Sequence, residues 1–227
     1  SRGLGDVYKR QVTNGNDCYS LSGATYGVYS DKGCTKSVAT LTTNANGNTD
    51  TVELRAATYY VKETKAPKGF QLDKNVYTMT VKVNETTTLK VSDKPKVTDT
   101  LVELFKIDME ISKATPQGNA SLEGAEFVWK YYDGYYTKDN LPSEPTRTWT
   151  TKTTTEKDSN NEVHYITRLA DSYKVLGDSF YTQNGTICLP LGTITVKEKT
   201  APNGYLLEGA YMQAAGSSEQ IKGVYVA

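Results

Sequence analysis

Two glutamates lie where a strand pattern turns them toward an apolar surface. Side chains alternate between the two faces of a strand, so Glu63 shares a face with Tyr59 and Val61. The same alternation places Glu198 on the apolar face of residues 194–198. A charged carboxyl at the edge of a core is costly, so we expect burial to raise the pKa of both glutamates. A raised pKa keeps a carboxyl protonated, which is the form that donates a hydrogen bond.

The same alternation of side chains predicts that an aspartate and a lysine point inward. Asp93 shares a face with Leu89 and Val91, and Lys106 shares a face with Leu104. Inward charges are unusual in a β-sandwich, but they can also protect a sheet edge from pairing with other chains. Alternation alone therefore leaves open whether this lysine and aspartate are reactive groups or edge guards.

The composition argues against most other kinds of site. Lysine plus arginine and aspartate plus glutamate both number 26, so the basic excess typical of nucleic-acid binders is absent. His164 is the only histidine, and the sequence has no glycine-rich phosphate loop, so we expect no metal, no cofactor and no turnover enzyme. No apolar run is long enough to span a bilayer, so we expect no membrane contact in this segment. Cys18, Cys34 and Cys188 do not make a disulfide framework, although a Cys18–Cys34 bridge stays open.

The elements that carry these residues occur twice. Residues 20–26 match residues 121–127 at an offset of 101, and residues 61–70 match residues 196–205 at an offset of 135. The matches keep their order, which indicates two copies of one module. The offsets differ by 34, so copy two carries about that many extra residues, and we expect them in a Tyr/Thr-rich insertion at about 128–180.

Polar residues around Pro95 mark the boundary between the copies. Copy one is expected at 12–97 and copy two at 98–227. The first eleven residues fit neither copy and resemble a translated sequencing adaptor, so we treat 1–11 as a non-native leader.

Strand patterns dominate both copies. Tyr77, Met79 and Val81 alternate with polar residues, and Asn46-Gly47 and Asn184-Gly185 are typical hairpin turns. No long stretch has helical periodicity. Short strands separated by turn signals predict an all-β chain of two tandem β-sandwich domains.

These segments resemble the prealbumin-like, Cna B-type (SpaA-type) repeat domains of Gram-positive surface adhesins and pilins. The resemblance rests on Leu104–Asp108, Leu122–Phe127 and Val196–Tyr205 in copy two, and on the matching Gly-Ala and Ala-Pro-x-Gly segments of copy one. It implies Ig-like, Greek-key sandwiches on the outside of the cell, attached to the wall.

The resemblance also implies a reaction. Many members of the family form an isopeptide bond between a first-strand lysine and a last-strand Asn or Asp, in a single turnover. A neutral amine attacks, and a protonated glutamate polarises the acceptor and carries protons. Glu63 and Glu198 match that glutamate, Lys106 matches the lysine of copy two, and Asp93 matches the acceptor of copy one.

Each copy holds only part of this set. Copy one has no lysine at the matching position outside the leader, and no Asn or Asp follows Asn203 in copy two. We therefore expect the first strand of copy one and the last strand of copy two to be missing. We also expect no cross-link in the sequence as given.

The aromatic residues of the insertion allow two interpretations. Tyr131, Tyr132, Tyr135, Tyr136 and Trp149 could form a ligand surface for a host matrix protein or glycan, or they could be cross-strand pairs in a long hairpin. The leading hypothesis is a structural stalk segment of a surface protein or pilin whose partners are the neighbouring repeats. The alternative is an adhesive module that binds through this insertion.

Overall fold

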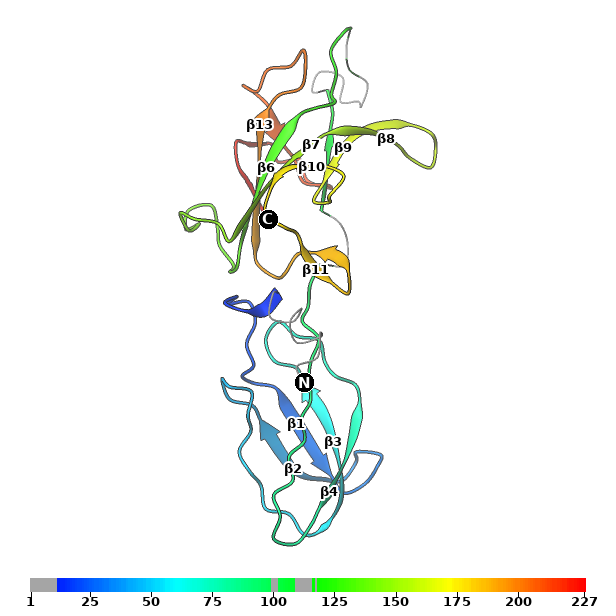
Figure 1. The fold of residues 1–227 in the computed structure, drawn as a ribbon, viewed down its shortest axis with the longest axis vertical. Coiled ribbons are helices and arrows are strands. Elements are labelled where there is room, and N and C mark those ends of the chain that lie inside the picture. Colours follow the sequence, from blue (N-terminus) through cyan, green and yellow to red (C-terminus); the bar gives the residue numbers. More distant parts are fainter. Residues whose placement is uncertain (1–11, 99–101, 109–115, 117) are drawn as a thin grey trace. The chain divides into compact units, whose positions relative to one another are not determined.

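The protein is described by a computed structural model that covers residues 12–98, 102–108, 116 and 118–227. Sixteen strands lie in these residues, and all of their pairings are antiparallel (Figure 1), so the predicted all-β class is confirmed. The chain divides into two compact units, residues 1–97 and 98–227, which contain copy one and copy two. The expected leader, residues 1–11, lies outside the described residues. No helix in the described part combines the length and apolarity that a membrane crossing needs.

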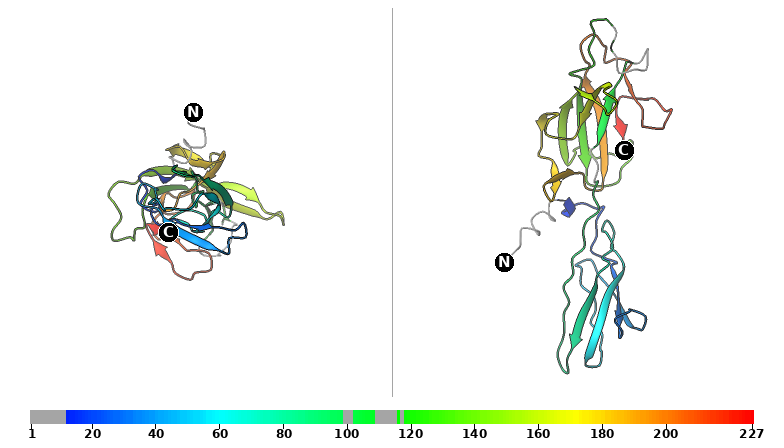
Figure 2. Two further views of the ribbon diagram at one scale, coloured as in Figure 1. Left: turned by 90° about the horizontal axis from the view of Figure 1, so that it is seen from below. Right: turned by 90° about the vertical axis from the view of Figure 1, so that its right-hand side faces the viewer.

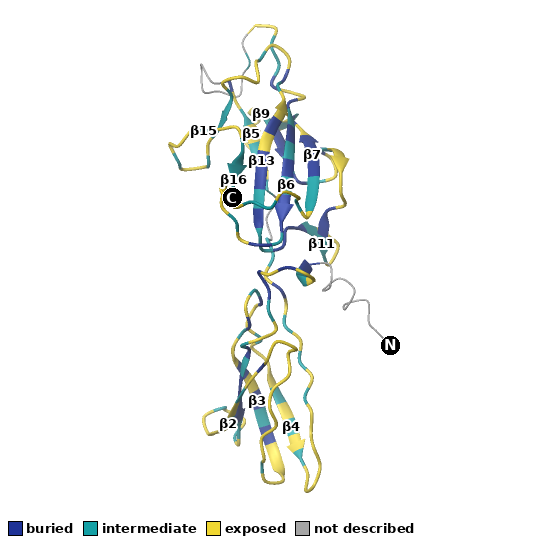
Figure 3. Cartoon of the chain, turned by 90° about the vertical axis from the view of Figure 1, so that its left-hand side faces the viewer, coloured by how far each residue is buried: buried dark blue, intermediate teal, exposed yellow. Residues whose placement is uncertain are grey.

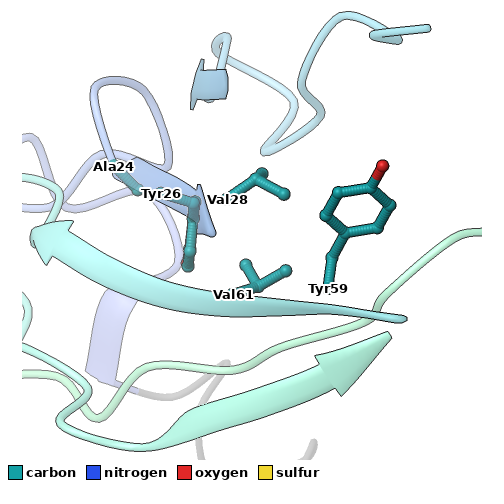
Figure 4. Packing of buried hydrophobic residues seen from close by; sticks show 5 residues of the cluster. All are labelled: Ala24, Tyr26, Val28, Tyr59 and Val61. Carbon is teal, nitrogen blue, oxygen red and sulfur yellow. The ribbon is translucent and has the colours of Figure 1, made fainter. Parts of the chain in front are cut away.

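Unit 1 is built on one four-stranded sheet in the order β2-β1-β3-β4. Its strands are β1 (Thr25–Tyr29), β2 (Ser37–Thr42), β3 (Ala57–Lys65) and β4 (Val76–Val81). Figure 4 shows the five core residues carried on or beside β1 and β3, which are Ala24, Tyr26, Val28, Tyr59 and Val61. Leu54, Leu89 and Val91 pack against them from segments outside the sheet, so the predicted inward face near residue 90 covers this core.

Unit 2 contains a five-stranded sheet, β10-β7-β6-β13-β16, a three-stranded sheet, β5-β9-β8, and two small hairpins, β11-β12 and β14-β15 (Figure 2). The strands are β5 (Glu103–Lys106), β6 (Glu126–Tyr132), β7 (Arg147–Lys152), β8 (Thr154–Lys157), β9 (Val163–Arg168), β10 (Lys174–Gly177), β11 (Tyr181–Gln183), β12 (Thr186–Cys188), β13 (Thr193–Thr200), β14 (Tyr211–Met212), β15 (Ile221–Lys222) and β16 (Tyr225–Val226). Phe127, Trp149 and Ile166 are almost fully buried. A 2.7 Å hydrogen bond from Thr167 Oγ1 to Thr151 Oγ1 joins β9 to β7 within this core.

The two units share a strand register. Glu63 of β3 faces Tyr26 of β1, and Glu198 of β13 faces Phe127 of β6, so both pairs obey the offsets of 101 and 135. Each pairing shifts register at the same place, just beyond the glutamate. The equivalence extends to the strand at the sheet edge, because β4 pairs with β3 in unit 1 and β16 pairs with β13 in unit 2.

A buried threonine makes the same pair of hydrogen bonds in each unit. Thr43 Oγ1 accepts the N–H of Ala24 and donates to the carbonyl of Leu21 in unit 1. Thr153 Oγ1 makes the same two bonds with Ala125 and Leu122 in unit 2. The repeat therefore includes side-chain hydrogen bonds as well as strand pairing.

The extra residues of copy two lie in separate places and do not form one block at 128–180. Residues 128–132 belong to β6, and residues 147–152 belong to β7, the counterparts of β1 and β2. The additions are the long β6–β7 connection, the region from β8 to β12, and the β14-β15 hairpin. The β14-β15 hairpin comes after residues 196–205, the second matched motif. The difference of 34 between the two offsets counts only residues between the matched motifs, so it does not include the hairpin.

The turns and cysteines agree only partly with the sequence predictions. Asn184 and Gly185 have φ values of 52° and 79° between β11 and β12, which confirms that hairpin. Gly47 also has a positive φ of 77°, but its turn follows β2 without pairing β2 to β3. Cys34 is a free thiol, so the Cys18–Cys34 disulfide is not formed.

Candidate functional site

Lys106 and Glu198 of unit 2 meet across the core. Lys106 ends β5 and pairs with Tyr165 of β9, whereas Glu198 lies on β13. Lys106 Nζ lies 2.8 Å from Glu198 Oε2, and the two side chains are 16% and 9% exposed. The structure thus brings together two residues that are 92 positions apart in the sequence. A contact of this length with little water around it is a strong charge-assisted hydrogen bond.

The second oxygen of Glu198 is also buried. Glu198 Oε1 has no hydrogen-bond partner among the described residues. A buried oxygen without a partner is unusual, because burial removes its water and nothing replaces the lost hydrogen bond. The carboxyl therefore holds the lysine with one oxygen and has the other available for a further group.

A second buried carboxyl lies two residues beyond the lysine. Asp108 is 3% exposed, and its Oδ2 accepts a 2.7 Å hydrogen bond from the hydroxyl of Tyr205. Tyr205 follows the Ala-Pro-x-Gly turn at the end of β13. Sequence reasoning did not assign a role to Asp108, although its spacing from Lys106 placed both residues on one strand face.

Glu63 occupies the equivalent position in unit 1 and is 1% exposed. Its Oε2 accepts a 2.6 Å hydrogen bond from the N–H of Asp73. Asp73 is held in turn by the hydroxyl of Tyr77 at 2.5 Å and by the N–H of Asn75 at 2.9 Å. The loop between β3 and β4 thus supplies the donor that Lys106 supplies in unit 2. Glu63 Oε1, like Glu198 Oε1, is buried with no hydrogen-bond partner in the described part of the chain.

The surroundings of Glu63 perturb several acids. Burial raises the pKa of Glu63, as the sequence predicted, and the negative charge of Asp93 raises it further against the opposing hydrogen bond from Asp73. Burial also raises the pKa of Tyr26, with contributions from Asp93 and Glu63. The hydroxyl of Tyr77 lowers the pKa of Asp73. Glu63 and Asp93, the two residues predicted for copy one, therefore lie close enough to influence each other.

The predicted aromatic ligand surface is wrong for three of its five residues. Trp149 is 0% exposed, and Tyr131 and Tyr132 are 1% and 5% exposed. The Trp149 ring stacks on Phe180 in the core with centroids 5.5 Å apart. Tyr135 is 64% exposed.

The remaining member of the set, Tyr136, is half-buried and packs edge-on against Tyr132. The five residues therefore do not form one exposed platform.

A cluster that the sequence did not predict lies at the β8–β9 turn. Donor atoms of Asp158, Glu162 and His164 lie within 4.8 Å of one another, and His164 Nε2 is 3.1 Å from Asp158 Oδ2. Both acids are exposed, and Asp158 Oδ1 already accepts two backbone N–H groups of the turn. The contacts of this cluster are those of a capped hairpin turn, and we assign it no function.

Comparison with known proteins accounts for the architecture of unit 1. Residues 9–95 match the SpaA family, described as a prealbumin-like fold domain. This part of the chain is similar to SpaA-type prealbumin-like domains. Unit 2 repeats the strand register of unit 1 and adds the segments described above.

The similar proteins include one named as a bacterial surface protein and one named as a pilus adhesin. The trypsin-resistant surface T6 protein of Streptococcus pyogenes serotype M6 is 39% identical over 88 residues, which is 35% of this chain and 16% of that protein. The Bacillus anthracis TIE protein is 25% identical with a TM-score of 0.49, over 83% of this chain and 27% of that chain. A C-terminal fragment of the pilus adhesin SpaC from Lactobacillus rhamnosus GG is 17% identical with a TM-score of 0.38, over 86% of this chain and 75% of the fragment. The chain thus spans about a sixth of the curated relative.

Proposed function

We propose that this chain is a structural segment of a wall-anchored surface protein or pilin of a Gram-positive bacterium, with domains of the kind stabilised by isopeptide bonds. The likeness of residues 9–95 to SpaA-type domains and of the chain to a streptococcal surface protein supports the cellular location. The partners of such a segment are the neighbouring repeats of its own chain.

The observation that carries the chemical part of the proposal is the buried 2.8 Å contact between Lys106 and Glu198. In the reaction, the Lys106 amine gives a proton to Glu198 and attacks the side-chain carbonyl carbon of an Asn or Asp. Protonated Glu198 donates a hydrogen bond to the carbonyl oxygen and then passes its proton to the leaving group. The regenerated carboxylate accepts the second proton that the attacking nitrogen loses as the amide forms. A C–N bond forms, and ammonia leaves from Asn or water from Asp.

The two units would contribute different parts of this chemistry. Unit 1 offers Asp93 as acceptor and Glu63 as acid, whereas unit 2 offers Lys106 as nucleophile and Glu198 as acid. The buried oxygens Glu63 Oε1 and Glu198 Oε1 are suited to the acceptor carbonyl, because they have no hydrogen-bond partner among the described residues. The acceptor for Lys106 is not identified in the described part of the chain.

Intact-mass spectrometry of the parent surface protein tests the proposal. Each bond lowers the mass by one ammonia or one water, so the protein should weigh less than its sequence. Glu198→Ala should prevent one bond, so the variant should keep the ammonia or water that this bond would release. Glu162→Ala changes an exposed glutamate and should leave the number of bonds unchanged. A parent protein with the full mass of its sequence would overturn the chemical part and leave the resemblance to SpaA-type domains intact.

A further inference from the structure

The outer face of the five-stranded sheet in unit 2 is hollowed into a groove. The groove has a volume of about 450 Å³. Its floor is formed by Val128, Lys130 and Tyr132 of β6 and by Thr195 and Lys197 of β13. These residues alternate with Phe127 and Trp129, so they lie on the sheet face opposite the core. Figure 3 looks onto β6 and β13, with β16 beside β13.

The walls of the groove come from segments that copy one lacks. Leu141 belongs to the long β6–β7 connection, residues 133–146, where unit 1 has only residues 30–36 between β1 and β2. Leu207 and Val224 stand on either side of the β14-β15 hairpin, the other addition. Two additions that are far apart in the sequence thus border one face of the shared sheet.

The floor carries two ammonium groups that no carboxylate of the described residues neutralises. Lys130 lies opposite Thr195, and Lys197 lies opposite Val128, so the two lysines are diagonal neighbours on one face. Diagonal neighbours are about 7–8 Å apart, and like charges at such positions repel. Neither lysine forms an ion pair with a described residue. An anion between them would relieve this repulsion.

The other charged groups leave the groove positive. Lys199, at the rim, is paired with Glu126 at 3.2 Å. Glu198 lines the groove, but its Oε2 binds Lys106 on the core side of the sheet. The floor and walls between the lysines are aliphatic, formed by Val128, Leu141 and Leu207. The groove therefore offers an apolar surface with positive charge in its floor.

We propose that this groove binds a short acidic peptide segment of a partner protein, with carboxylates on both sides of one aliphatic side chain. The aliphatic side chain packs between Leu141 and Leu207, and the carboxylates pair with Lys130 and Lys197. A peptide fits better than a sugar, because Tyr132 is only 5% exposed and presents little ring for a sugar to stack on. This site is independent of the cross-linking chemistry, which lies on the other face of the sheet.

Fluorescence polarisation of the 227-residue chain tests this assignment. The probe is a short fluorescein-labelled peptide with glutamates on both sides of one leucine, and its counterpart has lysines in place of the glutamates. We expect binding of the acidic probe only, and weaker binding as NaCl is added, because salt screens exposed charges. The double variant Lys130→Gln/Lys197→Gln should bind at least about tenfold more weakly, since it loses both charge pairs.

A matched double variant controls for net charge. Lys90→Gln/Lys157→Gln removes two exposed lysines outside the groove and should bind as the unaltered chain does. The assignment is wrong if the acidic probe does not bind, if the lysine probe binds equally well, or if both double variants weaken binding equally. Probe binding and the mass of the chain are separate readouts, so a chain that shows no cross-link but binds the acidic probe would overturn the cross-linking proposal alone.

Discussion

Replacing Lys106 by methionine should destabilise unit 2 by stranding a buried carboxylate. Lys106 and Glu198 are 16% and 9% exposed and lie 2.8 Å apart. Removing one partner of a buried ion pair costs roughly 3–5 kcal/mol, because the remaining charge keeps its desolvation penalty without compensation. Some water reaches both groups, so we expect the lower end of that range, about 3 kcal/mol.

A double variant separates the interaction from the loss of packing. Lys106→Met/Glu198→Leu replaces both charges with apolar groups of similar size and should fall within about 1 kcal/mol of the unaltered protein. Urea unfolding followed by tryptophan fluorescence measures these differences. The chain has only two tryptophans, Trp129 and Trp149, and both lie in the core of unit 2, so the signal reports that unit.

Two results would refute this reasoning. If Lys106→Met changed the free energy of unfolding by less than about 0.5 kcal/mol, the buried contact would not exist in solution. If the double variant were as unstable as the single variant, the loss would come from packing and not from a stranded charge.

Three further substitutions test other parts of the structure. Burial raises the folded-state pKa of Glu63, so unit 1 should lose stability as pH rises from the unfolded-state pKa through the folded-state pKa. Glu63→Gln should reduce this dependence of the free energy of unfolding on pH, as measured by NMR-monitored titrations. Gly69→Ala puts a Cβ 2.6 Å from the carbonyl oxygen of Cys18, so it should lower the melting temperature of unit 1 more than Gly23→Ala, which has a similar φ and open space around it. Trp149→Ala should cost about 3–5 kcal/mol of unit 2 stability in urea unfolding followed by circular dichroism, and an unchanged free energy of unfolding would show that this ring is not in the core.

Alternation along strands predicted the faces of the key residues but not what covers each face. It placed Glu63 and Glu198 on apolar faces, and both are buried. It could not show that Tyr131 and Tyr132, which are neighbours on opposite faces of β6, are both buried. Tyr132 is covered on the outer face by segments found only in copy two, and a repeat comparison carries no information about such segments.

Contacts made by loops could not be predicted from the sequence either. The N–H of Asp73 reaches Glu63 because the loop folds back and Tyr77 holds the Asp73 side chain, and no periodicity encodes that path. The meeting of Lys106 with Glu198 followed from the family resemblance, because two residues 92 positions apart have no local relationship. The strand framework is thus local information, whereas the site depends on how two sheets face each other.

Peptide mapping of the parent surface protein by tandem mass spectrometry tests the central claim most directly. The account predicts a branched peptide in which Lys106 Nζ is joined to the side chain of an Asn or Asp, and it predicts that this peptide disappears in the Glu198→Ala variant. Recovery of Lys106 only in unbranched peptides from the folded, unaltered protein would contradict the claim that the buried lysine and glutamate form a cross-linking site.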